Sequence, residues 1–286
     1  MLNITDLLIN EVETRLASHY AVMFGPEDSG HLDLAIKVSR QALSLIATSN
    51  ALYHNQEHTA HVVIVGMQIL LGRHIERADV TREQWLNVIT ALVCHDVGYV
   101  RGACGIDDGQ RIATGVGGLW TTFPPGISDA ALMPLHIDRG KAFVTETLTT
   151  ASPMLDVTMV QACIERTRFP TPAGAEYAQT GDYPGLVRGA DLIGQLSDPR
   201  YLAKLSAVFF EFEETGFNSQ TGYRTPGDLL AAYPSFFQHH VVPYIVDSER
   251  YLGLTRDGRA TLAGLYGNLE TARQAGARLP TPLRQA

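Results

Sequence analysis

The chain has 286 residues, a net charge of −8 and 45% hydrophobic residues, which suits one large globular domain. The negative charge argues against binding to a nucleic acid polymer, which needs a basic surface. Without a signal-like N-terminus, a long apolar run or a CxxC pair among its three cysteines, the sequence predicts a cytoplasmic protein with no membrane partner.

Helical periodicity dominates the sequence, and no segment alternates between apolar and polar residues as a half-buried strand would. Thr5 or Asp6 can cap the first helix, and Thr81 with Gln84 forms a capping-box pattern further on. We therefore predict an all-α fold in a single domain over residues 1–286. The expected helices cover residues 5–19, 31–48, 54–72, 82–95, 136–149, 153–166, 184–195, 199–215, 226–251 and 258–275.

A glycine-rich segment, Gly98 to Pro134, interrupts the helices directly after His95 and Asp96. Long segments without regular structure in a globular domain are usually functional or mobile. We expect an active-site loop here, with a disordered insertion as the alternative.

His95 and Asp96 close an apolar segment that otherwise has the character of a core helix, Trp85 to Val93. A buried carboxylate is normally paired or bound to a metal, and an imidazole beside it suits ions such as Zn, Fe and Mn. The alternative is a helix C-terminus at which a histidine favours the dipole and Asp96 simply follows.

Two further segments supply similar side chains. His54, His58 and His61 have helical spacing, so in a helix they share one inward face with Val65. Taken alone, His61 is better explained as a hydrogen-bonded core residue. Asp191 is a single acid in the largely apolar stretch 185–195, where it could also cap a helix or pair with Arg188.

The order of these residues resembles the HD superfamily of metal-dependent phosphohydrolases. Within that superfamily, the stretch from Tyr53 to His58 is similar to the signature of the cyclic nucleotide phosphodiesterases. The similarity extends in patches from about residue 50 to 250, with flanking helices on both sides. It implies an HD-type catalytic core whose metal site lies among the helices. It also implies that His54 donates a proton and that four residues bind metal: His58, His95, Asp96 and Asp191.

The sequence also departs from the phosphodiesterase pattern. Those enzymes have a histidine where this chain has Tyr99, and a glutamine that reads the purine where it has Ala232. Phe236 matches the position of their purine clamp. His136, at the start of a predicted helix, is the best candidate for binding a second metal.

We expect a phosphohydrolase that uses a divalent metal ion (Zn, Mn, Mg, Fe or Ni) and acts on a small phosphorylated substrate. Arginines near these motifs could neutralise the phosphoryl group: Arg101, Arg139, Arg166 and Arg168. Two alternatives remain. One is a di-iron oxygenase of the HD type, and the other is an HD-fold sensor without catalytic activity.

Overall fold

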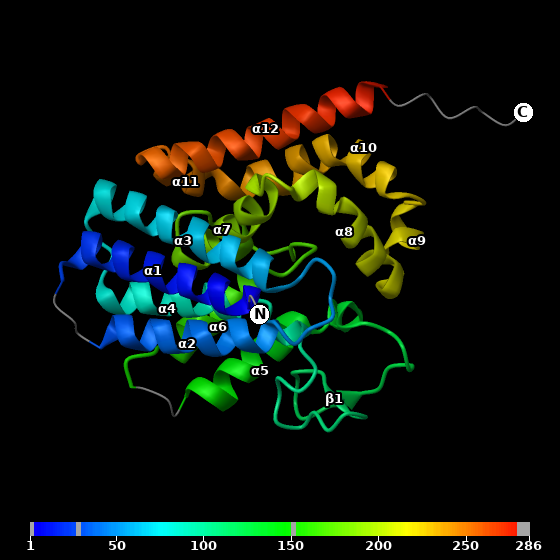
Figure 1. Cartoon of the computed structure of the whole chain (residues 1–286), viewed down its shortest axis with the longest axis horizontal. Coiled ribbons are helices and arrows are strands. Elements are labelled where there is room, and N and C mark those ends of the chain that lie inside the picture. The colour runs from blue at the N-terminus through cyan, green and yellow to red at the C-terminus, as the bar shows by residue number, and fades with distance from the viewer. Residues whose placement is uncertain (1–2, 27–29, 150–152, 279–286) are drawn as a thin grey trace, which may run out of the picture.

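The computed structural model describes residues 3–26, 30–149 and 153–278, and helices make up most of them (Figure 1). The all-α prediction is confirmed. The α-helices are α1 (Ile4–Phe24), α2 (His31–Ile46), α3 (Gln56–Arg77), α4 (Arg82–Cys94), α5 (His136–Leu148), α6 (Val157–Arg166), α7 (Tyr183–Ser197), α8 (Tyr201–Thr215), α9 (Phe217–Thr221), α10 (Pro226–Phe236), α11 (Val242–Leu252) and α12 (Arg256–Arg278). The shorter elements are the 3-10 turns η1 (Val97–Tyr99), η2 (Asp129–Leu132) and η3 (Glu176–Ala178), the π-helical turn η4 (Phe237–Val241), and the strands β1 (Ile112–Ala113) and β2 (Trp120–Thr121).

Capping side chains decide where the helices near the site begin. The predicted capping box of α4 is confirmed, because Thr81 and Gln84 each accept a backbone hydrogen bond from the other. The predicted cap of α1 is wrong, since Asn3 caps that helix and Gly25, with φ of 84°, ends it.

Asn55 caps α3, where its side chain accepts hydrogen bonds from the backbone N–H groups of Glu57 and His58. The helix therefore begins at Gln56. His54 lies just outside it, so the prediction that His54 shares a helical face with His58 is wrong.

A single hydrophobic cluster runs from α1 to α12, with α3 and α7 packed against each other at its centre (Figure 1). Gly194 allows this close contact, because a Cβ atom there would lie 2.9 Å from the Cα atom of Val62. The two helices that carry His58 and Asp191 are thus held side by side. None of the helices described is both long and apolar enough to span a membrane.

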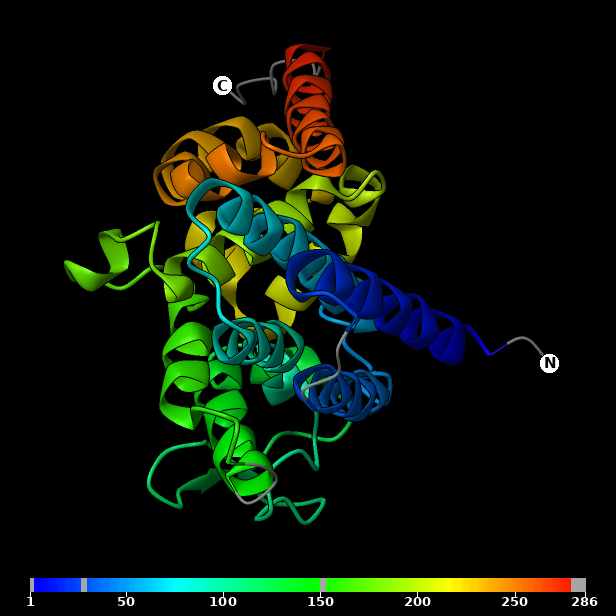
Figure 2. The same ribbon diagram turned by 90° about the vertical axis from the view of Figure 1, so that its left-hand side faces the viewer.

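The glycine-rich segment 98–134 has a defined course over α5, so the alternative of a disordered insertion is wrong (Figure 2). Its anchor is Arg139, which is fully buried and donates to the carbonyl oxygens of Gly98, Val100 and Ala113, each at 2.7 Å. The same guanidinium lies 2.9 Å from Asp107. A buried ion pair with nearly all its hydrogen bonds made therefore orders this part of the chain.

Candidate metal centre

Four polar side chains from three helical segments converge at the centre of the core. His58 comes from the first turn of α3, His95 and Asp96 follow the end of α4, and Asp191 lies on α7. The Nε2 atom of His58 lies 3.2 Å from Asp96 Oδ2 and 3.5 Å from Asp191 Oδ1. For Nε2 of His95 the corresponding distances are 3.2 Å and 3.6 Å. The structure therefore brings together the four residues for which a metal site was predicted.

The polar atoms of this cluster are what a bound cation would satisfy. His95 Nε2 and Asp96 Oδ2 are buried without a hydrogen-bond partner, which is costly unless a further group contacts them. His95 Nδ1 lies 2.7 Å from the carbonyl oxygen of Leu92, so it donates there and leaves the Nε2 lone pair facing the cluster. Two imidazole nitrogens and two carboxylates fit a divalent ion such as Zn, Fe or Mn.

The electrostatics of the cluster also favour a cation. Burial opposes the charged form of His58, but the nearby carboxylates of Asp191 and Asp96 outweigh it and raise the pKa of His58 to about 10. Burial likewise opposes the charged form of Asp96, yet the neighbouring His95 and His58 hold its pKa well below the usual range. Without an ion, His58 is therefore protonated at neutral pH.

One side of the cluster is more open than the other. The side chains of His58, His95 and Asp96 are at most 4% exposed, whereas that of Asp191 is 19% exposed. His54, at 18%, is also partly accessible. The accessible side of the cluster is therefore the side of Asp191 and His54.

His54 has a partner that sequence reasoning missed. Its Nδ1 atom lies 2.5 Å from Oε2 of Glu211 on α8, and the other oxygen of Glu211 accepts from the backbone N–H groups of Tyr53 and His54. Burial would raise the pKa of Glu211, but His54 and these hydrogen bonds lower it, so the carboxylate stays ionised at neutral pH. The available signal was a lone acid within the apolar run 207–212.

Tyr99 also lies beside the cluster. Its ring stacks between those of His54 and His136, with both centroid distances at 4.5 Å. His136 Nε2 lies 4.0 Å from Asp96 Oδ1, and its Nδ1 donates to the carbonyl oxygen of Met133. Burial lowers the pKa of His136 to about 4, so the neutral ring has a lone pair available for an ion. His136 thus lies beside the cluster, but it and Asp96 alone would make a sparse ligand set for a second metal.

The arginines and the phenylalanine that the sequence suggested for substrate binding make contacts outside the cluster. Each arginine considered for the phosphoryl group is already in an ion pair: Arg101 with Asp129, Arg139 with Asp107, Arg166 with Asp182, and Arg168 with Asp138 and Glu165. Phe236 packs against Phe169 and His240, and no described ring contact joins it to the histidines of the cluster. The alternative pairing of Asp191 with Arg188 is wrong, since that arginine donates to backbone carbonyls.

His61 faces a different group of acids, Glu57 and Asp198, with ligand atoms within 4.8 Å of one another. The ammonium of Lys204 lies 3.0 Å from Glu57 and 2.6 Å from Asp198. The ammonium of Lys204 therefore already pairs with both acids of this group.

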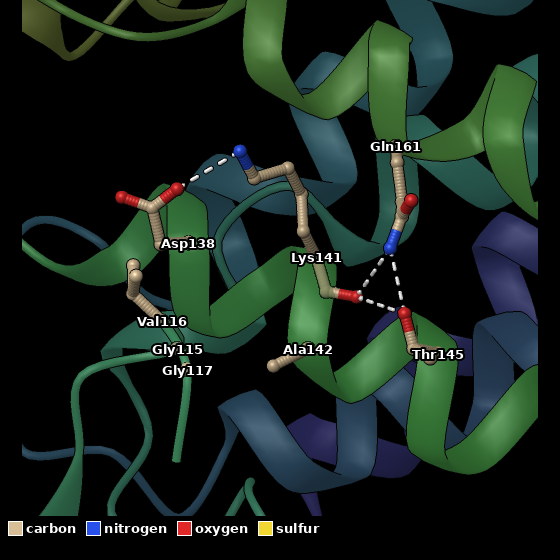
Figure 3. Close-up of a pocket in the computed structure, with 8 residues that line it drawn as sticks. All are labelled: Gly115, Val116, Gly117, Asp138, Lys141, Ala142, Thr145 and Gln161. Carbon is tan, nitrogen blue, oxygen red and sulfur yellow. Dashed lines mark hydrogen bonds and ion pairs between the residues drawn. The ribbon is translucent and has the colours of Figure 1, made fainter. Parts of the chain in front are cut away.

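A surface pocket of about 450 Å³ lies between the β1–β2 segment and the helices α5 and α6 (Figure 3). Lys141 is its cationic side chain, paired with Asp138 at 2.9 Å and with Glu165. Gln161 donates to Thr145 and to the carbonyl oxygen of Lys141. The polar groups of this pocket are thus engaged with one another, and none of the clustered histidines and aspartates lines it.

The fold and this cluster define the chain as an all-α protein with a candidate centre for a divalent metal. The sequence model of the Npun_R2479-like family matches residues 2–275, so the chain belongs to that family. No curated protein matches the chain.

Proposed function

We propose that the protein is a metal-dependent phosphohydrolase of the HD type, acting on a phosphoester or phosphodiester of a nucleotide or another small molecule. One observation carries this proposal. The convergent set of His58, His95, Asp96 and Asp191 has a histidine–carboxylate pair, His54 and Glu211, next to its open side.

These residues would divide the work. A divalent ion held by the four ligands would supply Lewis acidity, which polarises a phosphoryl oxygen and lowers the pKa of water. Glu211 accepts the Nδ1 proton of His54 and so leaves Nε2 to carry a proton toward the substrate. His54 would then protonate the leaving oxygen, a step that typically contributes about 10² to 10⁴ in rate.

The expected substrate is small, and its base is read weakly. Ala232 stands where the phosphodiesterase glutamine would pair with a purine, and a methyl group makes no such contact. Sites without a matched hydrogen-bonding group discriminate poorly between polar isosteres. We therefore expect broad activity on phosphodiesters and no strong preference between cyclic AMP and cyclic GMP.

The test is a side-by-side kcat/KM measurement on bis(p-nitrophenyl) phosphate and the two cyclic nucleotides, with added Mn²⁺, Mg²⁺, Zn²⁺ and Fe²⁺. Turnover that disappears in Asp96→Ala supports the proposal. A protein that binds one metal but turns over none of a broad phosphoester panel would instead act as a sensor. A hundredfold preference for one cyclic nucleotide would mean that another residue reads the base.

A di-iron oxygenase is the second candidate, and His136 is the observation that favours it. Its Nε2 lies 4.0 Å from Asp96 Oδ1, so a second ion between them would share Asp96 with the first. Elemental analysis separates the two functions. Two irons per chain with an oxygen-dependent optical spectrum favour oxygenation, whereas one ion with phosphoester turnover favours hydrolysis.

A further inference from the structure

Arg188 on α7 is a buried arginine with an unusual set of partners. Its side chain donates to the carbonyl oxygen of Tyr177 at 2.7 Å and to that of Gln179 at 3.1 Å. The guanidinium also lies over the ring of Tyr244, 4.1 Å from its centroid. The residue is only 3% exposed, and its Nε atom is buried without a hydrogen-bond partner.

The other arginines that are buried among the described residues each have a carboxylate. Arg188 lacks one, since no described acid lies within 4 Å of its guanidinium. The paired arginines are Arg73 with Asp79 at 2.8 Å, Arg139 with Asp107 at 2.9 Å, and Arg166 with Asp182 at 3.2 Å. A buried charge without a counter-ion is costly, so the exception calls for an explanation.

A second buried guanidinium, that of Arg166, lies beside the guanidinium of Arg188. Arg166 and Arg188 both donate to the carbonyl oxygen of Gln179, at 3.2 Å and 3.1 Å. Asp182 is the only carboxylate described in ion-pair contact with either of them, so the pair keeps one uncompensated positive charge. Burial and the neighbouring Arg166 lower the pKa of Arg188 to about 10, which still leaves it charged at neutral pH.

We propose that Arg188 and Arg166 form a binding site for a phosphate group of a small ligand. A guanidinium presents parallel N–H donors that match two oxygens of a phosphate, and the free Nε–H of Arg188 supplies a donor that the protein does not use. The shared carbonyl oxygen of Gln179 marks where a phosphate oxygen would be held between the two cations.

The connection between α6 and α7, residues 167–182, covers this site, because Tyr177 and Gln179 belong to it. Most of its residues are exposed or half-buried, and it projects from the helical body (Figure 2). If this connection moved away, Arg188 would lose its hydrogen bonds to the carbonyl oxygens of Tyr177 and Gln179. Phosphate oxygens would then accept those hydrogen bonds instead. Arg188 precedes Asp191 by three residues on α7, about 5 Å along the helix, yet it is not a member of the metal cluster. The phosphate site therefore does not depend on the function proposed above.

The test is titration of the full-length protein with inorganic phosphate, followed by calorimetry and by the thermal midpoint, at constant ionic strength made up with chloride. We expect phosphate to bind the wild type and Arg188→Met to weaken that binding at least tenfold. Arg188→Lys keeps the charge but lacks the two-donor edge, so its affinity should fall between them. Without phosphate, Arg188→Met should melt at or above the wild-type temperature, because it removes an uncompensated charge.

Arg73→Met is the matched control, because Arg73 is also buried and donates to the same connection at Gly181, but is paired with Asp79. It should lower the melting temperature and leave phosphate affinity unchanged. Metal content is measured in every variant, so that phosphate bound at the metal centre is counted equally. Absence of phosphate binding to the wild type overturns the proposal. So does equal affinity in the wild type and both Arg188 variants.

Discussion

The Nδ1 atom of His54 lies 2.5 Å from a carboxylate oxygen of Glu211, a residue 157 positions further along the chain. Glu211 is 1% exposed in its side chain and also accepts from the backbone N–H groups of Tyr53 and His54. Three hydrogen bonds thus fix both the backbone and the ring of His54.

The first prediction concerns this pair. His54→Gln should keep the metal and lower kcat on a phosphoester by about 10² to 10⁴, because it removes a proton donor and no ligand. Glu211→Gln should lower kcat to a value between those of wild type and His54→Gln, since the neutral amide orients the ring less well. Metal content by elemental analysis is measured beside the rates. Glu213→Gln, an exposed change on the same helix, is the control, and loss of metal in His54→Gln would show that His54 is a ligand.

The second prediction concerns protons released by metal uptake. The Asp191 and Asp96 carboxylates hold the pKa of His58 at about 10 in the absence of an ion, so at pH 7 this ring is protonated. A metal must displace that proton, and its affinity should therefore rise with pH between about 6 and 9. Calorimetry in two buffers of different ionisation enthalpy gives the number of protons released. His61→Gln should behave as the wild type, Asp96→Ala should bind little metal, and uptake without proton release would contradict this account.

Much of the cluster could be predicted because each of its four residues is a hard-to-bury side chain in an apolar segment. Such residues are rarely buried alone, and the imidazoles of His58 and His95 lie beside the carboxylates of Asp96 and Asp191. The all-α fold followed from periodicity for the same reason, since apolar stripes at helical spacing must face a core.

The remaining features of the site could not be predicted, because they depend on contacts that the spacing of residues in the sequence does not reveal. Glu211 reaches His54 from a helix far along the chain, and its place among apolar residues marks it as buried without naming its partner. Asn55, the residue after His54, caps the start of α3 because its side chain accepts hydrogen bonds from the first N–H groups of the helix. His54 therefore lies outside the helix that the spacing predicted. Nearness in sequence also failed to predict what the arginines contact. Arg139 is three residues from His136, yet its guanidinium donates to carbonyl oxygens of the segment 98–134.

The third prediction concerns Gly98, two residues after Asp96. A Cβ atom there would lie 1.8 Å from the carbonyl oxygen of His136, so a side chain would force η1 away from the first turn of α5. Gly98→Ala should lower the free energy of unfolding by about 2–4 kcal/mol, measured by urea denaturation. Gly267→Ala, at an exposed position of α12 with no atom within 4 Å of the new Cβ, should instead raise it by about 0.5–1 kcal/mol. Similar effects of the two changes would show that the close approach at Gly98 is unimportant.

The last prediction concerns pH and the ion pairs of Glu165. Lys141 and Arg168 lie 2.5 Å and 2.6 Å from its two carboxylate oxygens, and Tyr177 donates to it at 3.0 Å. Burial would raise the pKa of Glu165, but Arg168 and Lys141 lower it from 4.5 to about 2. The unfolded chain therefore binds more protons than the folded one between these values, and stability rises with pH across that range.

This contribution is complete above about pH 4.5 and is lost as the pH falls toward 2. Glu165→Gln should consequently lower the free energy of unfolding by about 1 kcal/mol at pH 7, a value kept modest by the partial exposure of the group. The deficit should shrink steadily below pH 4.5. Urea denaturation at a series of pH values measures it, with Glu176→Gln, an exposed acid between α6 and α7, as the control. A deficit that is as large at pH 3 as at pH 7 would mean that packing, and not charge, is what the substitution removes.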